Sequence, residues 1–231
     1  FSVQPSRLFP YHPGHSRLSL ISLWVYLTPH QQKWLGGEVL KLCQARGDEI
    51  RAVLAPEGDR LHEAAQQAGI AVSPCGNRIC ANDIPPDTDL ILAAHAHAFI
   101  DAGARMVTRL GALGYHPSLL PRHRGREAIR WTLHMREPVA GGTVYWMDDG
   151  ADTGPIAAQD WCHVRRDDDA ASLWRRELAP MGVRLIRQVL ADLDRGKVVV
   201  RPQDETVATW EPAFTRKRLA SGVKSGANQG N

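Results

Sequence analysis

Short apolar runs and amphipathic stretches alternate along the first half of the chain. Runs such as residues 89–94 are apolar almost throughout, which is typical of strands buried on both faces of a sheet. The stretches between them place apolar residues at helical spacing and end at Gly47 and Gly69. We therefore predict strands at 18–24, 50–55, 70–72 and 89–94, helices from Trp34 to Gly47 and from an Asp59 cap to Gly69, and a loop at 74–86.

The second half continues this alternation. A long helix should begin at the three aspartates of residues 167–169, because their charges favour the positive end of a helix dipole. Pro180 should kink or divide this helix, and Gly196 should end it. The other predicted elements are a helix at 99–110, a strand ending at His116, a helix at 126–135, and strands at 143–147 and 155–164, the last antiparallel at a sheet edge.

This order of elements predicts the fold class. Strands that alternate with helices favour an α/β fold, a Rossmann-like open sheet that is mostly parallel and twisted, with helices on both faces. At 231 residues, of which 43% are hydrophobic and 23% charged, the chain is long enough for one large globular domain. In such a sheet, chemistry is expected where strands give way to loops.

Charge, apolar runs and cysteine spacing limit the binding partners and the cellular compartment that we expect. A net charge of +3 is too small to predict binding to nucleic acid, and no apolar run is long enough to span a membrane. We expect a cytoplasmic protein whose cysteines are reduced, because they lack Cys-x-x-Cys spacing. The four cysteines are Cys43, Cys75, Cys80 and Cys162.

Two polar residues at predicted strand ends are the candidates for catalysis. His116 follows a short apolar run and precedes Pro117, which stiffens the loop that leaves the strand. Asp152 lies in a turn between Gly150 and Gly154, after another predicted strand. If the two loops are adjacent, the carboxylate can orient the imidazole for acid–base chemistry. A surface histidine and a turn-forming aspartate are the alternative interpretation.

Local motifs bear on two other kinds of site. The first strand is not followed by Gly-x-Gly-x-x-Gly, so a dinucleotide cofactor is not expected. His95 and His97 stand at the end of a predicted strand and could supply two imidazoles to one metal ion. A third ligand would have to come from His116 or Asp152. We favour a site without metal, because His-x-His alone is a weak signal.

Two longer motifs carry a resemblance to a known family. Residues 116–125 read His-Pro-Ser-Leu-Leu-Pro-Arg-x-Arg-Gly, and residues 148–154 read Asp-x-Gly-x-Asp-Thr-Gly. Together they resemble the folate-dependent formyltransferase family, most of all the hydrolase domain of 10-formyltetrahydrofolate dehydrogenase and the catalytic domain of methionyl-tRNA formyltransferase. The similarity spans about residues 18–212 and is stronger in the second half.

The resemblance implies a reaction and the residues that perform it. It implies transfer of the formyl group of 10-formyltetrahydrofolate, a co-substrate, to an amine of a small-molecule acceptor, with no metal. His116 would move protons and stabilise the oxyanion, and Asp152 would orient His116 or a water. The donor would bind at His95, Ala96, His97, Ala98, Phe99, Ile100, Asp148 and Gly150, and the acceptor-side loop would include Gly114, Pro117 and Ser118, with a turn-capping role as the alternative for Ser118.

Position 114 departs from the family pattern. The transferases carry an asparagine there, which hydrogen-bonds the formyl oxygen, and this chain has Gly114. Three outcomes follow: formyl transfer with another oxyanion donor, hydrolysis of 10-formyltetrahydrofolate to tetrahydrofolate and formate, or folate binding without turnover. Neither the acceptor nor the oligomeric state is determined by these motifs.

The resemblance also suggests domain boundaries. We expect an irregular leader at 1–16, the catalytic domain at 17–212 and a flexible tail at 213–231, which is rich in Lys, Arg, Gly and Ser. The transfer-RNA enzymes continue into a further domain at this point. The short remainder of this chain therefore argues against transfer RNA as the acceptor.

Overall fold

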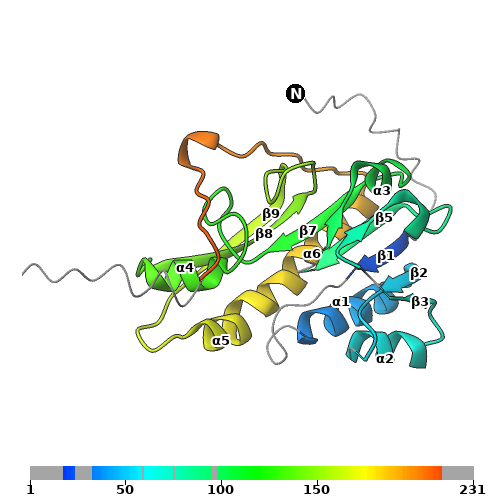
Figure 1. Cartoon of the computed structure of the whole chain (residues 1–231), viewed down its shortest axis with the longest axis horizontal. Helices are drawn as coiled ribbons and strands as arrows, with labels where there is room; N and C mark the ends of the chain where they lie inside the picture. Colours follow the sequence, from blue (N-terminus) through cyan, green and yellow to red (C-terminus); the bar gives the residue numbers. More distant parts are fainter. Residues whose placement is uncertain (1–17, 24–32, 59, 75, 95–97, 215–231) are drawn as a thin grey trace, which may run out of the picture.

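The computed structural model describes residues 18–23, 33–58, 60–74, 76–94 and 98–214 (Figure 1). Within these residues a seven-stranded sheet has the order β3-β2-β1-β5-β7-β8-β9, and a smaller sheet pairs β4 with β6. The strands are β1 (Ser19–Leu23), β2 (Glu49–Leu54), β3 (Val72–Ser73), β4 (Arg78–Ile79), β5 (Leu90–Ala94), β6 (Phe99–Ile100), β7 (Ala112–His116), β8 (Val139–Trp146) and β9 (Ile156–His163). The expected leader, the Asp59 cap and most of the expected tail lie outside the described residues.

The large sheet changes from parallel to antiparallel pairing at β7. Strands β1, β2, β3, β5 and β7 pair in parallel, whereas β8 pairs antiparallel with both β7 and β9. The prediction of an antiparallel edge strand at 155–164 is therefore confirmed. Strand β8 begins at Val139 rather than Thr143, so it is longer than its apolar run alone suggests.

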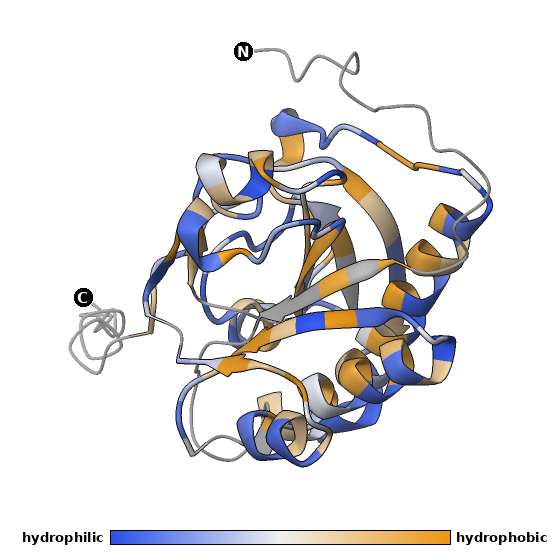
Figure 2. Cartoon of the chain, turned by 90° about the vertical axis from the view of Figure 1, so that its right-hand side faces the viewer, coloured by the Kyte–Doolittle hydropathy of each residue, from blue (hydrophilic) through white to orange (hydrophobic). Residues whose placement is uncertain are grey.

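Helices cover both faces of this sheet. The helices α1 (Lys33–Arg46), α2 (Arg60–Gln67) and α6 (Ala179–Asp194) contribute to one core, and the short helix α3 (Ala102–Met106) contributes to the other (Figure 1). Figure 2 shows hydrophobic residues on the strands and on the helix sides that face them. Strand β5 explains the apolar run: Leu90, Leu92 and Ala94 pack into the first core, Ile91 and Ala93 into the second. The predicted Rossmann-like α/β fold is confirmed.

The predicted helix at 99–110 is wrong over most of its length. Phe99 and Ile100 form β6 instead and pair with β4. Helix α3 begins only after Asp101, whose carboxylate accepts a hydrogen bond from Ala104 N at 2.8 Å. An N-cap at Asp101 therefore outweighs the helical spacing of the apolar residues around it.

The prediction of a loop throughout residues 74–86 is also wrong. Strand β4 and the 3-10 turn η2 (Ala81–Asp83) both lie within it. The strand forms because Phe99 N donates to Asn77 O, and Asp101 N donates to Ile79 O. These partners come from a distant segment, so composition gives no sign of them.

The long helix after the aspartate cluster is divided, as predicted. It consists of α5 (Ala170–Leu173), a π-helical turn η3 (Trp174–Leu178) and α6. Pro180 has no N–H to donate to the carbonyl four residues before it, and the widened turn lies directly ahead of it. The carboxylate of Asp169 accepts from Ser172 N at 2.7 Å and so caps the start of α5.

Candidate functional site

His116 is the last residue of β7, at the carboxyl end of the parallel strands. Its side chain is 9% exposed, because β7 is buried along its whole length. Pro117 follows and cannot donate to a sheet, so the chain leaves the strand there. The hydroxyl of Ser118 donates to Arg122 O at 2.6 Å and closes the turn. The imidazole is thus held at a strand end, as the sequence predicts.

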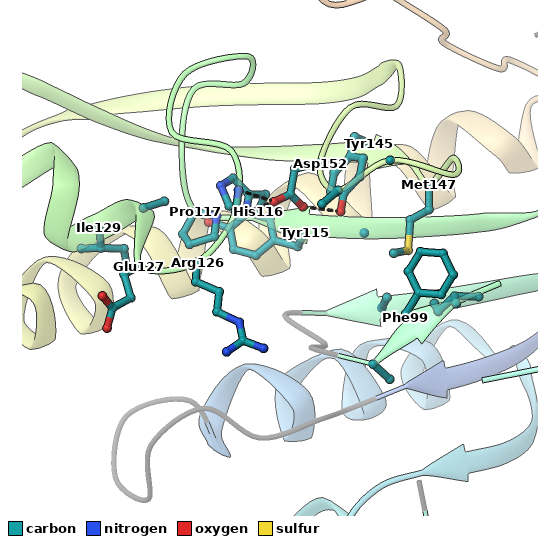
Figure 3. Close-up of a pocket in the computed structure, with 18 of the residues that line it drawn as sticks. Phe99, Tyr115, His116, Pro117, Arg126, Glu127, Ile129, Tyr145, Met147 and Asp152 are labelled. Carbon is teal, nitrogen blue, oxygen red and sulfur yellow. Dashed lines mark hydrogen bonds and ion pairs between the residues drawn. The ribbon is translucent and has the colours of Figure 1, made fainter. Parts of the chain in front are cut away.

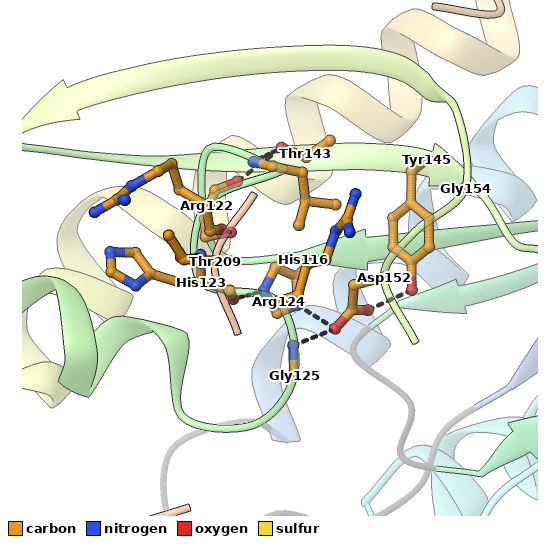
Figure 4. Close-up of polar contacts among 12 residues, drawn as sticks. His116, Arg122, His123, Arg124, Gly125, Thr143, Tyr145, Asp152, Gly154 and Thr209 are labelled. Carbon is orange, nitrogen blue, oxygen red and sulfur yellow. Dashed lines mark hydrogen bonds and ion pairs between the residues drawn. The ribbon is translucent and has the colours of Figure 1, made fainter. Parts of the chain in front are cut away.

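Both ring nitrogens of His116 face oxygen atoms. Nε2 lies 2.7 Å from the carbonyl oxygen of His123, and Nδ1 lies 3.5 Å from Oδ2 of Asp152 (Figure 4). A carbonyl oxygen only accepts, so the proton of that bond sits on Nε2. Nδ1 can then reach the carboxylate either as the protonated nitrogen of an imidazolium or through a bridging water. The structure therefore brings the imidazole and the carboxylate close together, which is the arrangement that acid–base chemistry would need.

Asp152 is held by donors from two other segments. Its Oδ2 accepts from Gly125 N at 2.8 Å, and its Oδ1 accepts from the hydroxyl of Tyr145 at 2.7 Å (Figure 4). The residue itself has a left-handed backbone with φ of 58°, which a short polar side chain tolerates best. These contacts stabilise the ionised carboxylate and point it at His116.

Tyr145 comes from β8 and lies directly opposite Gly114 of β7. A Cβ built on Gly114 would lie 2.8 Å from Cε1 of the tyrosine ring and 3.0 Å from its hydroxyl oxygen. Glycine is therefore required at position 114 for the ring to take this position. Burial first, and then the charge of Asp152, raise the pKa of Tyr145 well above its ordinary value, so the hydroxyl remains a donor.

The segment after α6 returns across the loop that carries these contacts. Nε2 of Gln203 donates to Asp152 O at 2.9 Å and to Gly154 O at 2.7 Å. His123 N donates to the hydroxyl oxygen of Thr209 at 2.8 Å. This segment, which includes the turn η4 (Glu205–Val207), therefore fixes both loops that supply the His116–Asp152 pair.

Two buried polar side chains of the same loop strengthen this attachment. The guanidinium of Arg124 binds Glu205, with one N–O distance of 2.8 Å. The ring of His123 is 2% exposed and lies between Glu137 and Glu211, each 3.1 Å from a ring nitrogen. At these two distances the ring nitrogens are not aligned as in hydrogen bonds. Both contacts join the loop to distant parts of the chain.

A pocket of about 390 Å³ contains the pair, which is a volume suited to a small organic ligand (Figure 3). One end is apolar and is lined by Phe99 and Met147 (Figure 3). The middle is lined by His116, Tyr145 and Asp152, and the other end by residues of helix α4 (Ala128–His134) and of the loop before it. A ligand can thus present one group to the pair while its remainder extends in both directions.

The residues predicted from sequence fall into three groups. Lining the pocket are His116, Asp152, Ala98, Phe99, Ile100, Asp148, Gly150, Gly114 and Pro117. Ser118 is buried but is not among the lining residues, and its hydroxyl is used within the turn. His95, Ala96 and His97 lie outside the described residues.

Sequence reasoning missed several residues of the site. The sequence pattern places Tyr145 only in a strand and Arg126 only at a helix start. The register between β7 and β8 would have identified the tyrosine, since it faces Gly114. No local signal identifies Gln203 or Thr209, because they reach the site only through the return of the C-terminal segment.

Catalysis by a cysteine nucleophile or by a bound metal ion finds less support in the described part of the chain. Burial first, then the charge of Asp48, raises the pKa of the Cys43 thiol to about 12. Burial first, then Glu177, raises that of Cys162 to about 11, so neither thiol is suited to act as a nucleophile. Among the same residues no three His, Cys, Asp or Glu side chains converge as metal ligands. The alternative of a metal at His95 and His97 falls outside them.

Across residues 33–214, gaps excepted, none of the helices combines the length and the apolar character that a membrane crossing requires.

Comparison with known proteins identifies relatives of the chain. Residues 85–190 match the family model described as formyl transferase. Cytosolic 10-formyltetrahydrofolate dehydrogenase of Homo sapiens is 44% identical over 194 residues, which cover 78% of this chain and 22% of the relative. Methionyl-tRNA formyltransferase of Methylacidiphilum infernorum is 37% identical over 130 residues, 56% of this chain and 40% of the relative. The chain thus spans less than half the length of these relatives.

Solved structures agree on the fold. Glycinamide ribonucleotide transformylase 1 of Symbiobacterium toebii superposes with a TM-score of 0.65 and 22% identity, over 81% of this chain and 95% of that one. HypX of Aquifex aeolicus, in complex with tetrahydrofolic acid, gives 0.61 and 21%, over 87% of this chain and 31% of that one. At such identities the likeness supports the Rossmann-like architecture.

Proposed function

Because the chain belongs to the folate-dependent formyltransferase family, we propose that it transfers the formyl group of 10-formyltetrahydrofolate to an amine of a small-molecule acceptor. The observation that carries this proposal is the meeting of His116 and Asp152 beside a pocket with an apolar end. The tetrahydrofolate complex of the structurally similar HypX supports a folate as donor.

The apolar end of the pocket is where we place the pterin ring. Phe99 and Met147 offer a flat apolar surface next to the smaller Ala98. Asp148 adds a polar edge, and its Oδ1 already accepts from the hydroxyl of Thr153 at 2.6 Å. A ring bound there extends its formyl-bearing nitrogen toward His116, in the middle of the pocket. The acceptor then enters from the end formed by α4 and its preceding loop.

The reaction we propose is a direct attack without an enzyme-bound intermediate. The amine nitrogen forms a bond to the formyl carbon, and the bond from that carbon to the folate nitrogen then breaks. The amine loses one proton and the folate nitrogen gains one. The enzyme therefore transfers a proton between them, and its own protonation is unchanged at the end of the reaction. His116 carries that proton and interacts with the negative oxygen, while Asp152 orients it or an ordered water.

The acceptor end of the pocket suggests what the acceptor carries. Arg126 lines this end and is exposed, and among the described residues no carboxylate lies within pairing distance of its guanidinium. The neighbouring Glu127 is used elsewhere, since it binds Arg130 and the backbone N of Phe214. We therefore expect an acceptor with a carboxylate or phosphate group.

Hydrolysis is the second candidate, and one distance favours it. The 3.5 Å between Nδ1 of His116 and Oδ2 of Asp152 is long for a direct hydrogen bond, so both groups can also bind a water beside them, and that water would be the nucleophile that attacks the formyl carbon. Hydrolysis would release formate and needs no acceptor site.

One experiment separates these functions. The purified protein is incubated with 10-formyltetrahydrofolate alone and with a panel of anionic amines, and formate, formylated amine and tetrahydrofolate are quantified. Product that depends on an amine supports transfer, and formate without any amine supports hydrolysis. Tight folate binding with neither product would contradict both and would support a binding module.

A further inference from the structure

The proposed reaction needs a hydrogen-bond donor for the formyl oxygen, and this inference rests on that proposed function. Charge develops on this oxygen when the formyl carbon is attacked. Gly114 lines the pocket but has no side chain that could donate a hydrogen bond. The nearby hydroxyls of Ser118 and Thr153 already donate to Arg122 O and to Asp148. Among the described residues of the pocket centre, His116 and Tyr145 are the remaining side-chain donors.

Tyr145 occupies the space that a side chain at position 114 would otherwise take. The two residues are paired across β7 and β8, and the ring lies within 3.0 Å of the Cβ position of Gly114. The phenol oxygen lies 2.7 Å from Oδ1 of Asp152 (Figure 3). A strand position therefore delivers a rigid hydroxyl to the place where the formyl group would bind.

A hydroxyl can donate one hydrogen bond, and in this structure the hydroxyl of Tyr145 donates it to Asp152. The carboxylate does not depend on that bond alone, because its Oδ2 also accepts from Gly125 N at 2.8 Å and faces His116. The hydroxyl can turn about its bond to the ring without moving any heavy atom. The negative formyl oxygen then competes with Asp152 for the hydrogen bond of this hydroxyl, and the carboxylate keeps its other donor when it loses this one.

We propose that Tyr145 is a catalytic residue of the formyl reaction, whose hydroxyl turns from Asp152 to the formyl oxygen as charge develops there. Gly114 is then also required, because a side chain at this position would occupy the space of the Tyr145 ring. The step moves a hydrogen bond and transfers no proton, so it needs no further reactant. Any nucleophile, amine or water, is served in the same way.

The first test removes the hydroxyl and keeps the ring. Tyr145→Phe is expected to lower kcat by about 100-fold, as for the loss of one oxyanion donor, and to change KM for 10-formyltetrahydrofolate by less than about three-fold. The same change is then made in an Asp152→Ala enzyme. If the hydroxyl acts on the substrate, adding Tyr145→Phe lowers kcat of the Asp152→Ala enzyme by a further factor of about ten or more. If the added change leaves kcat of the Asp152→Ala enzyme unaltered, Tyr145 serves only to position Asp152, and the proposal is overturned.

The second test moves the donor to the other strand. Tyr145→Val empties the space, and Gly114→Asn is added to refill it with an amide donor. The double variant is expected to recover at least about ten-fold of the kcat lost in Tyr145→Val. A matched Gly114→Ala with Tyr145→Val adds bulk without a donor and is expected to recover none. Equal activity of the two double variants, with folate binding and thermal unfolding unchanged, would overturn the proposal.

The same assays distinguish this proposal from the function on which it rests. A wild-type protein that neither transfers nor hydrolyses the formyl group overturns both. A wild-type protein that turns over, with a Tyr145→Phe variant of equal kcat, overturns the role of Tyr145 alone. Circular dichroism of each variant shows whether a loss of activity reflects a loss of fold.

Discussion

The backbone carbonyl of His123 lies 2.7 Å from Nε2 of His116, so the main chain at one histidine orients the imidazole of the other. His123 is in turn attached to Thr209 through its backbone N and lies between two glutamates. The position of the His116 imidazole thus depends on residues far along the chain. This arrangement leads to specific expectations for both kinetics and stability.

Replacing His116 by alanine should abolish most turnover while the fold survives. The loss of an acid–base group is expected to lower kcat by about 10²–10⁴-fold, and Asp152→Ala should do the same. His163, on strand β9 and outside the pocket, is the matched control, and His163→Ala should keep wild-type kcat. The measurement is product formation from 10-formyltetrahydrofolate at saturating donor. A His116→Ala enzyme with normal kcat would contradict the assignment.

Replacing Gln203 by alanine should weaken catalysis from a distance. Its amide holds Asp152 O and Gly154 O, so its loss should allow Asp152 to move and lower kcat on the order of 10-fold to 100-fold. The two carbonyls left unpaired should cost about 1–3 kcal/mol of unfolding free energy. Thr206 lies in the same segment, and within the described part of the chain its hydroxyl donates to Asp204, two residues before it. Thr206→Ala is the control, and kcat together with urea unfolding should separate the two variants.

Replacing Glu137 by glutamine should change how stability depends on pH. Burial raises the pKa of Glu137, but Arg122 and then His123 outweigh this and hold it below the ordinary value of 4.5. A carboxyl with a lowered pKa in the folded state adds stability above its unfolded value, and this is lost as pH falls through the folded value. The wild type should therefore lose its advantage over Glu137→Gln below about pH 4.5. Thermal unfolding across pH 3–7 tests this, and parallel profiles would contradict it.

Replacing Arg126 by alanine should affect substrate binding more than chemistry. An exposed guanidinium that binds an anion contributes modestly, so KM of an anionic acceptor should rise about two- to ten-fold with little change in kcat. Arg187, exposed on α6 and outside the pocket, provides the control. Comparing acceptors with and without the anionic group, and donors with and without the glutamate carboxylates, shows which ligand Arg126 contacts. An unchanged KM in every comparison would exclude this role.

Local patterns were sufficient to predict most elements and the places of His116 and Asp152 in the fold. The fully apolar β5 predicts burial on both faces because successive side chains of a strand point in opposite directions. His116 could be placed at a strand end because Pro117 cannot continue a sheet, and Asp152 could be placed in a turn because glycines flank it. In each case the determining interaction lies within a few residues of the position concerned.

The tertiary structure decided the rest, because the contacts involved join residues distant in the chain. Phe99 became a strand instead of a helix because Asn77 O accepts a hydrogen bond from its N–H. Tyr145 became part of the site because the register of β7 and β8 sets its ring over Gly114. Gln203 came to hold the backbone of Asp152 because the C-terminal segment crosses the loop before Gly125. The chain by itself thus specifies which residues can do chemistry, and the packing of the sheet and its C-terminal segment specifies which of them meet.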